Sequence, residues 1–285
     1  MKKKLHIAVQ KSGRLHTESL KLLNDCGISI DNGKDQLKAV ARNFPMEIFY
    51  LRNGDIPQYL RDGVVDIAII GENLLVEKGD DISIKEKLGF SKCRVSIAIP
   101  KEDIYKGIES LTGKKIATSY PNTVKGFLAE KGIDAELHII NGSVEIAPNI
   151  GLSDAVCDIV SSGSTLFKNN LKEVEVLFKS EAVLAASSTL SVEKNDILKK
   201  LQFRIQSVLK GRQSKYILMN VPNESIDKIS SILPVLKSPT VLPLAEPGWS
   251  SLHSVVNEGT FWEVIDELKA VPEQPVIRIK YVSSY

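Results

Sequence analysis

The sequence predicts an α/β protein of more than one domain, and three observations lead to this fold class. The chain has 285 residues, which is too long for one ordinary hydrophobic core. Strand-like runs alternate with helix-like runs through residues 1–209, and this alternation is typical of α/β layers built on parallel strands. After residue 212 the order changes to βαββαβ, which is the ferredoxin-like arrangement.

The strands of the first part are apolar runs that end at turn residues. Residues 64–70 contain few polar breaks, as expected for a strand covered on both faces. Residues 93–99 end at Pro100, which cannot donate to a sheet. In chain order we expect strands at residues 5–9, 64–70, 93–99, 116–118, 137–140 and 157–160.

The helices between these strands are predicted from apolar spacing and from end signals. Apolar residues recur at helical spacing from Leu15 to Cys26, and Gly27 follows as a stop. Asp55 can cap a short helix that tolerates Pro57 in its first turn. In chain order we expect helices at residues 15–26, 55–60, 121–131 and 195–209.

The last part of the chain follows a polar stretch, residues 210–215, that we expect to be a linker. Beyond it, the βαββαβ order comes from strands expected at residues 216–221, 240–244, 252–256 and 276–281, and from helices expected at residues 224–236 and 259–270.

Composition and charge exclude several classes of protein. The formal net charge is only +2, so no strong field selects nucleic acid or an anionic membrane. The apolar run after the N-terminal lysines is too short for a signal peptide, and no run is long enough to span a membrane. We therefore expect a cytoplasmic protein. The three cysteines are isolated and show neither metal-ligand spacing nor a disulfide framework.

Ligands of open α/β sheets bind beyond the carboxyl ends of the strands. This rule selects five segments as candidate binding loops before any motif is considered: Gln10–Arg14, Gly71–Glu72, Ser119–Tyr120, Asn141–Glu145 and Ser161–Thr165.

The most informative of these segments is the loop after the strand that contains Asp158. Small hydroxyl residues surround Gly163 there, which lets backbone N–H groups approach an anion closely. Their hydroxyls add donors, and Asp158 can accept hydrogen bonds from sugar hydroxyls. A phosphate seat and an ordinary Ser-rich turn both fit this segment. The residues concerned are Ser161, Ser162, Gly163, Ser164 and Thr165.

Other candidates are less specific. Lys11 and Arg14 flank a glycine at a strand-to-helix turn, which suits a polyphosphate, although this segment taken alone favours a solvated turn. Asp66 lies in an apolar strand, where a carboxylate needs a partner, and Arg94 can be that partner or an anion ligand. Tyr120 can stack on a base or pack in a core. Two acids complete the set of candidates, Glu72 and Glu145.

Taken together, these segments resemble the long form of the ATP phosphoribosyltransferase family. The matching stretches occur in the family's order and cover nearly the whole chain. They are residues 8–15, 55–60, 66–72, 88–94, 116–122, 142–148, 158–166, 219–222, 236–240, 243–245 and 248–249.

The resemblance implies a catalytic region of two lobes like those of periplasmic binding proteins, followed by an ACT-like regulatory domain. The first lobe would take residues 1–95 and 180–212, and the second lobe residues 96–179. The regulatory domain would take residues 213–285. The family also implies dimers that assemble into hexamers, and the long form needs no separate regulatory subunit.

The implied enzyme is a pentosyltransferase of histidine biosynthesis that requires Mg²⁺, with metal ligands that the sequence leaves unknown. Adenine N1 of ATP attacks C1 of phosphoribosyl pyrophosphate, and pyrophosphate leaves. By matching position, Asp158, Arg14 and Glu145 are the catalytic candidates. Ser161, Ser162, Gly163, Ser164 and Thr165 join Asp158 in binding phosphoribosyl pyrophosphate. Lys11, Arg14, Asp66, Glu72, Arg94 and Tyr120 would line the nucleotide side.

Histidine is the expected feedback inhibitor, and the matching positions in the third domain are Asn220, Leu236 and Thr240. Two other readings compete with this one. A solute-binding protein or effector sensor can share the two-lobed cleft, because a fold does not settle a function. A different glycosyltransferase is the second alternative. A dehydrogenase is disfavoured, since no Gly-x-Gly-x-x-Gly follows the first strand.

Overall fold

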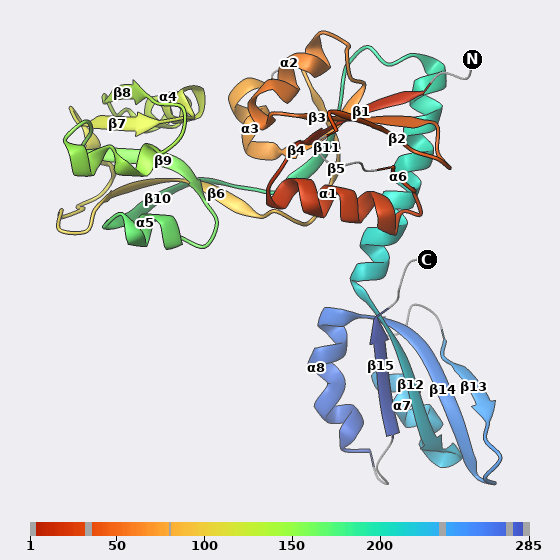
Figure 1. Cartoon of the computed structure of the whole chain (residues 1–285). Coiled ribbons are helices and arrows are strands. Elements are labelled where there is room, and N and C mark those ends of the chain that lie inside the picture. Colours follow the sequence, from red (N-terminus) through yellow and green to blue (C-terminus); the bar gives the residue numbers. More distant parts are fainter. Residues whose placement is uncertain (1–3, 32–35, 80, 234–237, 272–275, 282–285) are drawn as a thin grey trace. The chain divides into compact units, whose positions relative to one another are not determined.

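The computed structural model describes residues 4–31, 36–79, 81–233, 238–271 and 276–281. The chain divides into two compact units, the first made of residues 1–21 and 29–198, the second of residues 22–28 and 199–285. The first unit contains two sheets, which define a first and a second lobe, and the second unit contains a third sheet (Figure 1).

The first lobe is built on a six-stranded sheet with the order β2-β3-β1-β4-β11-β5. Strands β1, β3 and β4 run parallel, whereas β2, β5 and β11 join the sheet antiparallel to their neighbours. The expectation of parallel strands is therefore correct only for the centre of this sheet. The strands are β1 Leu5–Gln10, β2 Lys38–Val40, β3 Met46–Leu51, β4 Ile67–Gly71, β5 Ser83–Lys87 and β11 Ala182–Ala186.

Two short helices, α2 (Ile56–Arg61) and α3 (Glu72–Lys78), cover one face of this sheet. Ile56 and Leu74 pack there against Ala68 and Val183 of the strands. Asp55 occupies the N-cap position of α2, but its side chain makes no capping hydrogen bond, which corrects the expectation from the sequence. Helix α1 (Arg14–Asp25) starts beyond the carboxyl end of β1, as its apolar spacing predicts.

The second lobe is built on a five-stranded sheet with the order β10-β6-β9-β7-β8. Strands β7, β8 and β9 run parallel, so their carboxyl ends share one edge, while β6 and β10 are antiparallel. The strands are β6 Cys93–Pro100, β7 Lys115–Thr118, β8 Glu136–Ile139, β9 Ala155–Val160 and β10 Leu171–Ser180.

Successive residues of β9 point to opposite faces of this sheet, and each face has its own core. Cys157 packs with Val124 and Leu128 of helix α4 (Pro121–Lys131). Val156 packs on the other face with Leu166 of the short helix α5 (Ser164–Lys168). The lobe is thus a three-layer α/β unit, and both α4 and α5 begin at the edge where the parallel strands end.

Two chain segments connect the lobes, and they hydrogen-bond to each other. One leads from β5 into β6, and the other leads from β10 into β11. The N–H of Ala182 donates to the carbonyl of Phe90 at 2.9 Å, and the N–H of Leu88 donates to the carbonyl of Ala182 at the same distance. These paired connections form the backbone link between the two sheets.

Helix α6 runs from Val192 to Arg212 and the next strand begins at Ser214, so half of the stretch predicted as a linker is helical and only Gln213 lies between the two elements. The polar composition of this stretch predicted a linker, whereas polar residues and one glycine are tolerated in the last turn of a helix. Lys210 and Arg212 lie in that turn, where positive charge favours the helix C-terminus, and Arg212 pairs with Asp25 at 2.6 Å.

The last sheet has the order β13-β14-β12-β15, and its elements follow the predicted βαββαβ sequence. Helices α7 and α8 cover one face, where Met219, Leu252 and Phe261 are fully buried. Thr240 and His253 are register partners, as are Leu242 and Ser251, at the edge pair of the sheet. The elements are β12 Ser214–Pro222, α7 Ile226–Ile232, β13 Thr240–Pro243, β14 Trp249–Asn257, α8 Glu258–Lys269 and β15 Val276–Tyr281.

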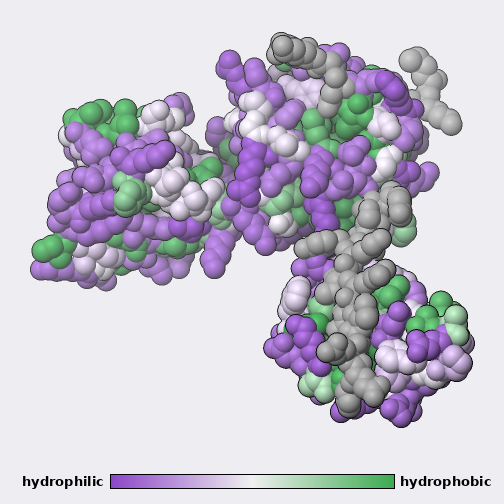
Figure 2. All heavy atoms as spheres, turned by 60° about the horizontal axis from the view of Figure 1, so that its bottom comes forward, coloured by the Kyte–Doolittle hydropathy of each residue, from purple (hydrophilic) through white to green (hydrophobic). Residues whose placement is uncertain are grey.

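Hydrophilic residues cover most of the visible surface of the first unit, and hydrophobic residues appear there only in scattered groups (Figure 2). Within the part of the chain that the structure describes, no helix combines the length and the apolar character needed to cross a membrane.

Candidate functional site

A cavity of about 280 Å³ lies beyond the carboxyl end of β9. Its polar lining comes from the candidates that the sequence selected, and Val156 and Leu166 close its apolar side. No Lys, Arg or His of the described chain lines this cavity. Its lining brings Glu145 together with polar residues at and after the end of β9: Asp158, Ser161, Ser162, Gly163 and Thr165.

The loop between β9 and α5 presents backbone and hydroxyl donors to this cavity. Gly163 has φ +78°, a left-handed conformation that glycine adopts without strain, and α5 begins immediately after it. The Ser162 hydroxyl donates to the Ser164 hydroxyl at 3.0 Å, while Ser161 and Thr165 are exposed. The loop therefore offers unblocked donors of the kind that bind a phosphate.

Asp158 lies on β9 at the entrance to this loop and is partly buried. Burial raises the pKa of its carboxyl group, the negative charge of Glu145 raises it further, and a 2.7 Å hydrogen bond from the N–H of Ile159 opposes both. The carboxylate thus lacks a positive partner in the described chain, and a ligand with hydroxyl donors or a cation would stabilise its charge.

Glu145 reaches the same cavity from the turn that follows β8. Gly142 and Ser143 both adopt positive φ, 87° and 51°, and this bend precedes the 3₁₀ turn Val144–Ile146 that carries Glu145. The turn is tied to the end of β7, because the Ser119 hydroxyl donates to the carbonyl of Ile140 at 2.8 Å. The turn is therefore held against the next strand of the sheet.

Arg94 lies beside the loop but is already paired. Its guanidinium donates to both carboxylate oxygens of Glu173, at 2.5 and 2.6 Å, and this pairing holds the pKa of Glu173 below its usual range. A third bond runs from Arg94 to the carbonyl of Ser161 at 3.1 Å. Arg94 thus supports the loop Ser161–Thr165 through the carbonyl of Ser161, a contact that the sequence did not predict.

The first-lobe candidates gather at the carboxyl ends of β1 and β4. Lys11 and Arg14 are exposed, and Arg14 lies 3.3 Å from Glu18 one helical turn along α1. Glu72 begins α3 and pairs with Lys87 at 3.1 Å. These residues share one edge of the first sheet, as the parallel strands require.

Tyr120 joins the two lobes at this edge. Its side chain is only 7% exposed, and its hydroxyl accepts a 2.8 Å hydrogen bond from the amide of Asn73. Burial, together with the charge of Asp158, raises its pKa. Little of the ring is open to a base in this arrangement. The carboxyl-end edges of both sheets therefore meet at the contact between Asn73 and Tyr120.

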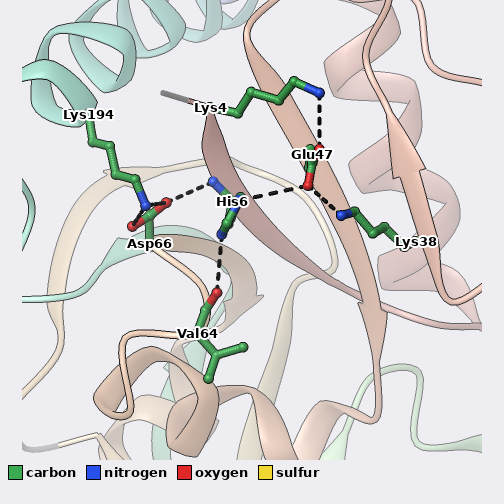
Figure 3. A network of polar contacts seen from close by, with 7 residues as sticks. All are labelled: Lys4, His6, Lys38, Glu47, Val64, Asp66 and Lys194. Atoms are coloured by element: carbon green, nitrogen blue, oxygen red, sulfur yellow. Dashed lines mark hydrogen bonds and ion pairs between the residues drawn. The ribbon is translucent and has the colours of Figure 1, made fainter. Parts of the chain in front are cut away.

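Asp66 lies elsewhere. It precedes β4 at the amino end of that strand, whereas Lys11, Arg14 and Glu72 follow the carboxyl ends of β1 and β4. Lys194 donates to its carboxylate at 2.8 Å, and the N–H of His6 donates to it at the same distance (Figure 3). Glu47 links His6 to Lys4 and Lys38 in the same network. The ion pair with Lys194 thus accounts for the burial of the Asp66 carboxylate, and we leave Asp66 out of the candidate site.

The predicted regulatory residues lie in the second unit. Asn220 alternates along β12 with the buried residues Met219 and Val221, so it points away from the helix-covered core. Thr240 lines a depression of about 550 Å³ together with Tyr216 and His253. Leu236 lies outside the described residues.

Two buried residues of α3, Asn73 and Glu77, were missed in the sequence. The one sequence feature that could have pointed to a role for Asn73 is its position just after the end of a predicted strand. No helix was predicted at these residues. Their partners are 45 or more residues away, and sequence spacing does not reveal such contacts.

Comparison with protein-family models identifies two regions. Residues 52–207 match the model described as ATP phosphoribosyltransferase, and residues 211–276 match the model described as HisG, C-terminal domain. An ATP phosphoribosyltransferase of Cytophaga hutchinsonii is 55% identical over 273 residues, covering 96% of each chain. One of Parabacteroides distasonis is 50% identical over the same length and coverage.

Solved structures agree with this result. The ATP phosphoribosyl transferase (HisG:HisZ) complex from Thermotoga maritima contains a chain with a TM-score of 0.62 and 28% identity, covering 72% of this chain and 98% of that one. A histidine kinase sensor domain with similarity to periplasmic binding proteins has a TM-score of 0.50 at 14% identity, covering 73% of this chain and 90% of that one, and supports the two-lobed fold alone.

The expectations of a two-lobed α/β region and a ferredoxin-like domain are confirmed. The family matches exclude a solute-binding protein and a glycosyltransferase of another family. The long-form arrangement follows from the presence of both family regions in one chain. The chain belongs to the ATP phosphoribosyltransferase family, the pentosyltransferases of histidine biosynthesis.

Proposed function

We propose that the chain transfers the phosphoribosyl group of phosphoribosyl pyrophosphate to N1 of the adenine of ATP, releasing pyrophosphate with inversion at C1. The single observation that carries this proposal is the cavity in which Asp158 and Glu145 face the hydroxyl-rich loop Ser161–Thr165. A sugar phosphate requires both halves of this arrangement, a donor-rich seat for its phosphate and acceptors for its hydroxyls.

The loop Ser161–Thr165 would hold the 5-phosphate of the sugar through its N–H groups and hydroxyls. Asp158 would accept hydrogen bonds from the ribose hydroxyls. Its raised pKa supports this role, because hydroxyl donors would offset the burial of its charge. Departure of pyrophosphate builds positive charge on the sugar, and the carboxylates of Asp158 and Glu145, which line the same cavity, would stabilise that charge.

Mg²⁺ is the expected metal, and the residues present fit it. Two carboxylates, Asp158 and Glu145, line one cavity, although no group of three or more metal-ligating residues occurs among the described residues. Mg²⁺ commonly takes one or two carboxylates and completes its shell with water and substrate phosphates. The ion would neutralise charge on the leaving pyrophosphate. Asp158 and Glu145 would hold it, while the loop orients the sugar.

The nucleotide side would be formed by the first-lobe edge and its neighbours. Lys11 and Arg14 are exposed cations beside Gly13, and they would face the triphosphate of ATP. Glu72 and Tyr120 would lie nearer the adenosine. Arg94 would act on the opposite substrate, since it supports the loop through the carbonyl of Ser161. Catalysis then consists mainly of aligning two anionic substrates and stabilising separated charge.

Histidine would inhibit the enzyme by binding the second unit. Asn220 and Thr240, with Leu236, are the proposed contacts, and the depression beside Thr240 supports this assignment. Inhibition requires histidine to prefer one of two global states of the protein. Because the chain carries its own regulatory region, we propose that it needs no separate regulatory subunit. Dimers and hexamers are expected, and light scattering would measure them.

The proposal is tested by a pyrophosphate-release assay with ATP and phosphoribosyl pyrophosphate, run with and without histidine. We expect release only when both substrates and Mg²⁺ are present, and a lower rate with histidine. A variant that ends at residue 212 should lose the inhibition. Pyrophosphate release from phosphoribosyl pyrophosphate without ATP would contradict the proposed reaction, and inhibition that survives the truncation would contradict the proposed histidine site.

A further inference from the structure

Helix α3 of the first lobe holds the start of helix α4 of the second lobe. The carboxylate of Glu77 accepts the N–H of Asn122 at 3.0 Å and the N–H of Thr123 at 2.9 Å. It also accepts the hydroxyl of Thr123 at 2.8 Å, and the side-chain amide of Asn122 donates back to the carbonyl of Glu77 at 3.1 Å. Glu77 is therefore an N-terminal cap supplied by the other lobe.

A second set of contacts lies one helical turn earlier on α3. The amide of Asn73 donates to the hydroxyl of Tyr120 at 2.8 Å. The backbone N–H of Asn73 donates to the Ser180 hydroxyl at 2.9 Å, and that hydroxyl donates to the side-chain oxygen of Asn73 at 3.0 Å. Asn73 thus joins helix α3, the second lobe and the segment that crosses between the lobes.

Both sets are buried and depend on one relative position of the lobes. Asn73, Glu77 and Ser180 are 3–4% exposed, and Tyr120 is 7% exposed. A buried polar group that loses its partner costs about 1–3 kcal/mol, and more when it is charged. Because Glu77 finds its partners across the lobe boundary, a change of the angle between the lobes would leave a buried carboxylate unsatisfied.

Gly71 supplies the space that Asn73 uses. A Cβ atom at position 71 would lie 2.3 Å from the side-chain oxygen of Asn73, although the backbone there, at φ −71°, suits any residue. A side chain at position 71 would therefore displace the amide of Asn73 without straining the backbone. The glycine at the end of β4 and the asparagine two residues later act as one unit.

We propose that Asn73 and Glu77 form an inter-lobe clamp, and that they are positioning residues for the transfer reaction. This inference rests on the proposed function, in which the second lobe holds the sugar phosphate and the first lobe holds the polyphosphate of ATP. The clamp orients the second-lobe sheet at Tyr120, where β7 ends. It thereby orients β9, which carries Asp158, toward the carboxyl ends of the first-lobe strands. A misplacement of about 1 Å in such a reaction can reduce the rate ~100-fold.

Three variants test the clamp in the full-length enzyme. Glu77→Gln weakens the cap of α4, and Asn73→Ala removes the bond to Tyr120. Gly71→Ala displaces the side chain of Asn73 without substituting that residue. Glu130→Gln is the matched control, because it makes the same charge change at the far end of α4 on a side chain that is 76% exposed. Turnover is measured per folded site, the dissociation constant of phosphoribosyl pyrophosphate by calorimetry, and amide exchange at Asn122 and Thr123 by NMR.

We expect each of the three variants to lower kcat by about tenfold or more, with the dissociation constant of phosphoribosyl pyrophosphate within about twofold of wild type. Exchange at Asn122 and Thr123 should accelerate in Glu77→Gln, and Glu130→Gln should match wild type throughout. A fall in kcat without a loss of affinity indicates a positioning role. A role only in the stability of the fold would lower the thermal midpoint and leave turnover per folded site unchanged.

Wild-type kcat in folded Glu77→Gln and Asn73→Ala would overturn the clamp. An equal loss of kcat and of affinity would also overturn it, because the damage would then lie in the second lobe alone. A wild-type enzyme that turned over both substrates but bound phosphoribosyl pyrophosphate outside the Ser161–Thr165 loop would contradict the proposed substrate site but not the reaction. The kcat of each variant relative to wild type would still decide whether Asn73 and Glu77 act as positioning residues.

Discussion

Helices α4 and α5 both begin at the same edge of the second-lobe sheet, yet their N-termini differ completely. The amides of Asn122 and Thr123 at the start of α4 bind the buried carboxylate of Glu77. The start of α5 follows Gly163 in an exposed loop, beside a cavity lined by Asp158. One N-terminus is closed by the protein itself, and the other is open to a ligand.

The difference shows that a strand, a turn and a helix start are not sufficient to make an anion site. Any helix N-terminus attracts negative charge, and at α4 the first lobe already supplies it. At the open loop of α5 no carboxylate of the described chain caps the helix, and the nearby acids, Asp158 and Glu145, line the cavity beside it. In the proposals made above, the same local geometry serves lobe orientation in one case and substrate binding in the other.

The largest expected effect comes from Asp158→Asn, which tests the open end directly. Because the amide is neutral, it loses the charge that would stabilise the developing positive charge of the sugar. We expect kcat to fall about 100-fold or more, which corresponds to roughly 2.7 kcal/mol of transition-state stabilisation. Steady-state kinetics and circular dichroism on the same sample would check it, and wild-type turnover would refute the role of Asp158.

A smaller effect is expected from Gly163→Ala, which leaves the loop residues in place and strains their backbone. An added Cβ meets nothing within 4 Å, but φ is +78°, so the substitution costs about 1 kcal/mol through the backbone alone. We expect the affinity for phosphoribosyl pyrophosphate to fall by about tenfold, measured by calorimetry.

Gly126→Ala is the control for this substitution. Gly126 lies inside α4, and a Cβ there also meets nothing within 4 Å, without a positive φ. The substitution should leave affinity unchanged and stabilise the helix by about 0.5–1 kcal/mol. Equal effects of the two glycine substitutions on binding would contradict the assignment of the loop.

The start of helix α8 adds a third case to the comparison, for which we expect a smaller effect on stability and none on turnover. Helix α8 is capped by its own Asn257, whose side chain accepts the N–H groups of Gly259 and Thr260 at 2.9 and 3.4 Å. Asn257→Ala should lower the stability of the second unit by about 1 kcal/mol, seen in its thermal midpoint. Turnover without histidine should stay at the wild-type value, and a large loss of turnover would count against separate roles for the two units.

The smallest expected effect is on the pH dependence of stability. The pKa of Asp158 is raised in the folded protein, so the folded state binds its proton more tightly than the unfolded state does. Its contribution to stability is therefore full below the unfolded pKa and is lost as the pH rises through the folded pKa. Asp158→Asn should raise the thermal midpoint at pH 7 relative to wild type, and this gain should vanish near pH 3.8 and below. A midpoint below wild type at pH 7 would contradict it.

Local patterns by themselves determined the elements of the candidate site. The apolar run that ends at Val160 and the small residues around Gly163 predict a strand followed by an anion-binding loop, and the structure has the strand and a loop that turns at Gly163. The rule that ligands bind beyond carboxyl ends also selected Asn141–Glu145, which reaches the same cavity. These features depend on near neighbours in the chain, so the sequence contains the information directly.

Only the tertiary structure decided which polar groups were available for chemistry. Asp66 pairs with Lys194, 128 residues away, and Arg94 pairs with Glu173. Nothing in the local sequence distinguishes these charges from Asp158. Strands β10 and β11 were missed because one is rich in charge and the other is a short alanine-rich run, and both are stabilised by antiparallel partners far along the chain. Glu77 acquires its role only when folding brings α4 to it, because burial and long-range partners, not residue type, determine whether a carboxylate caps a helix or is left for a substrate.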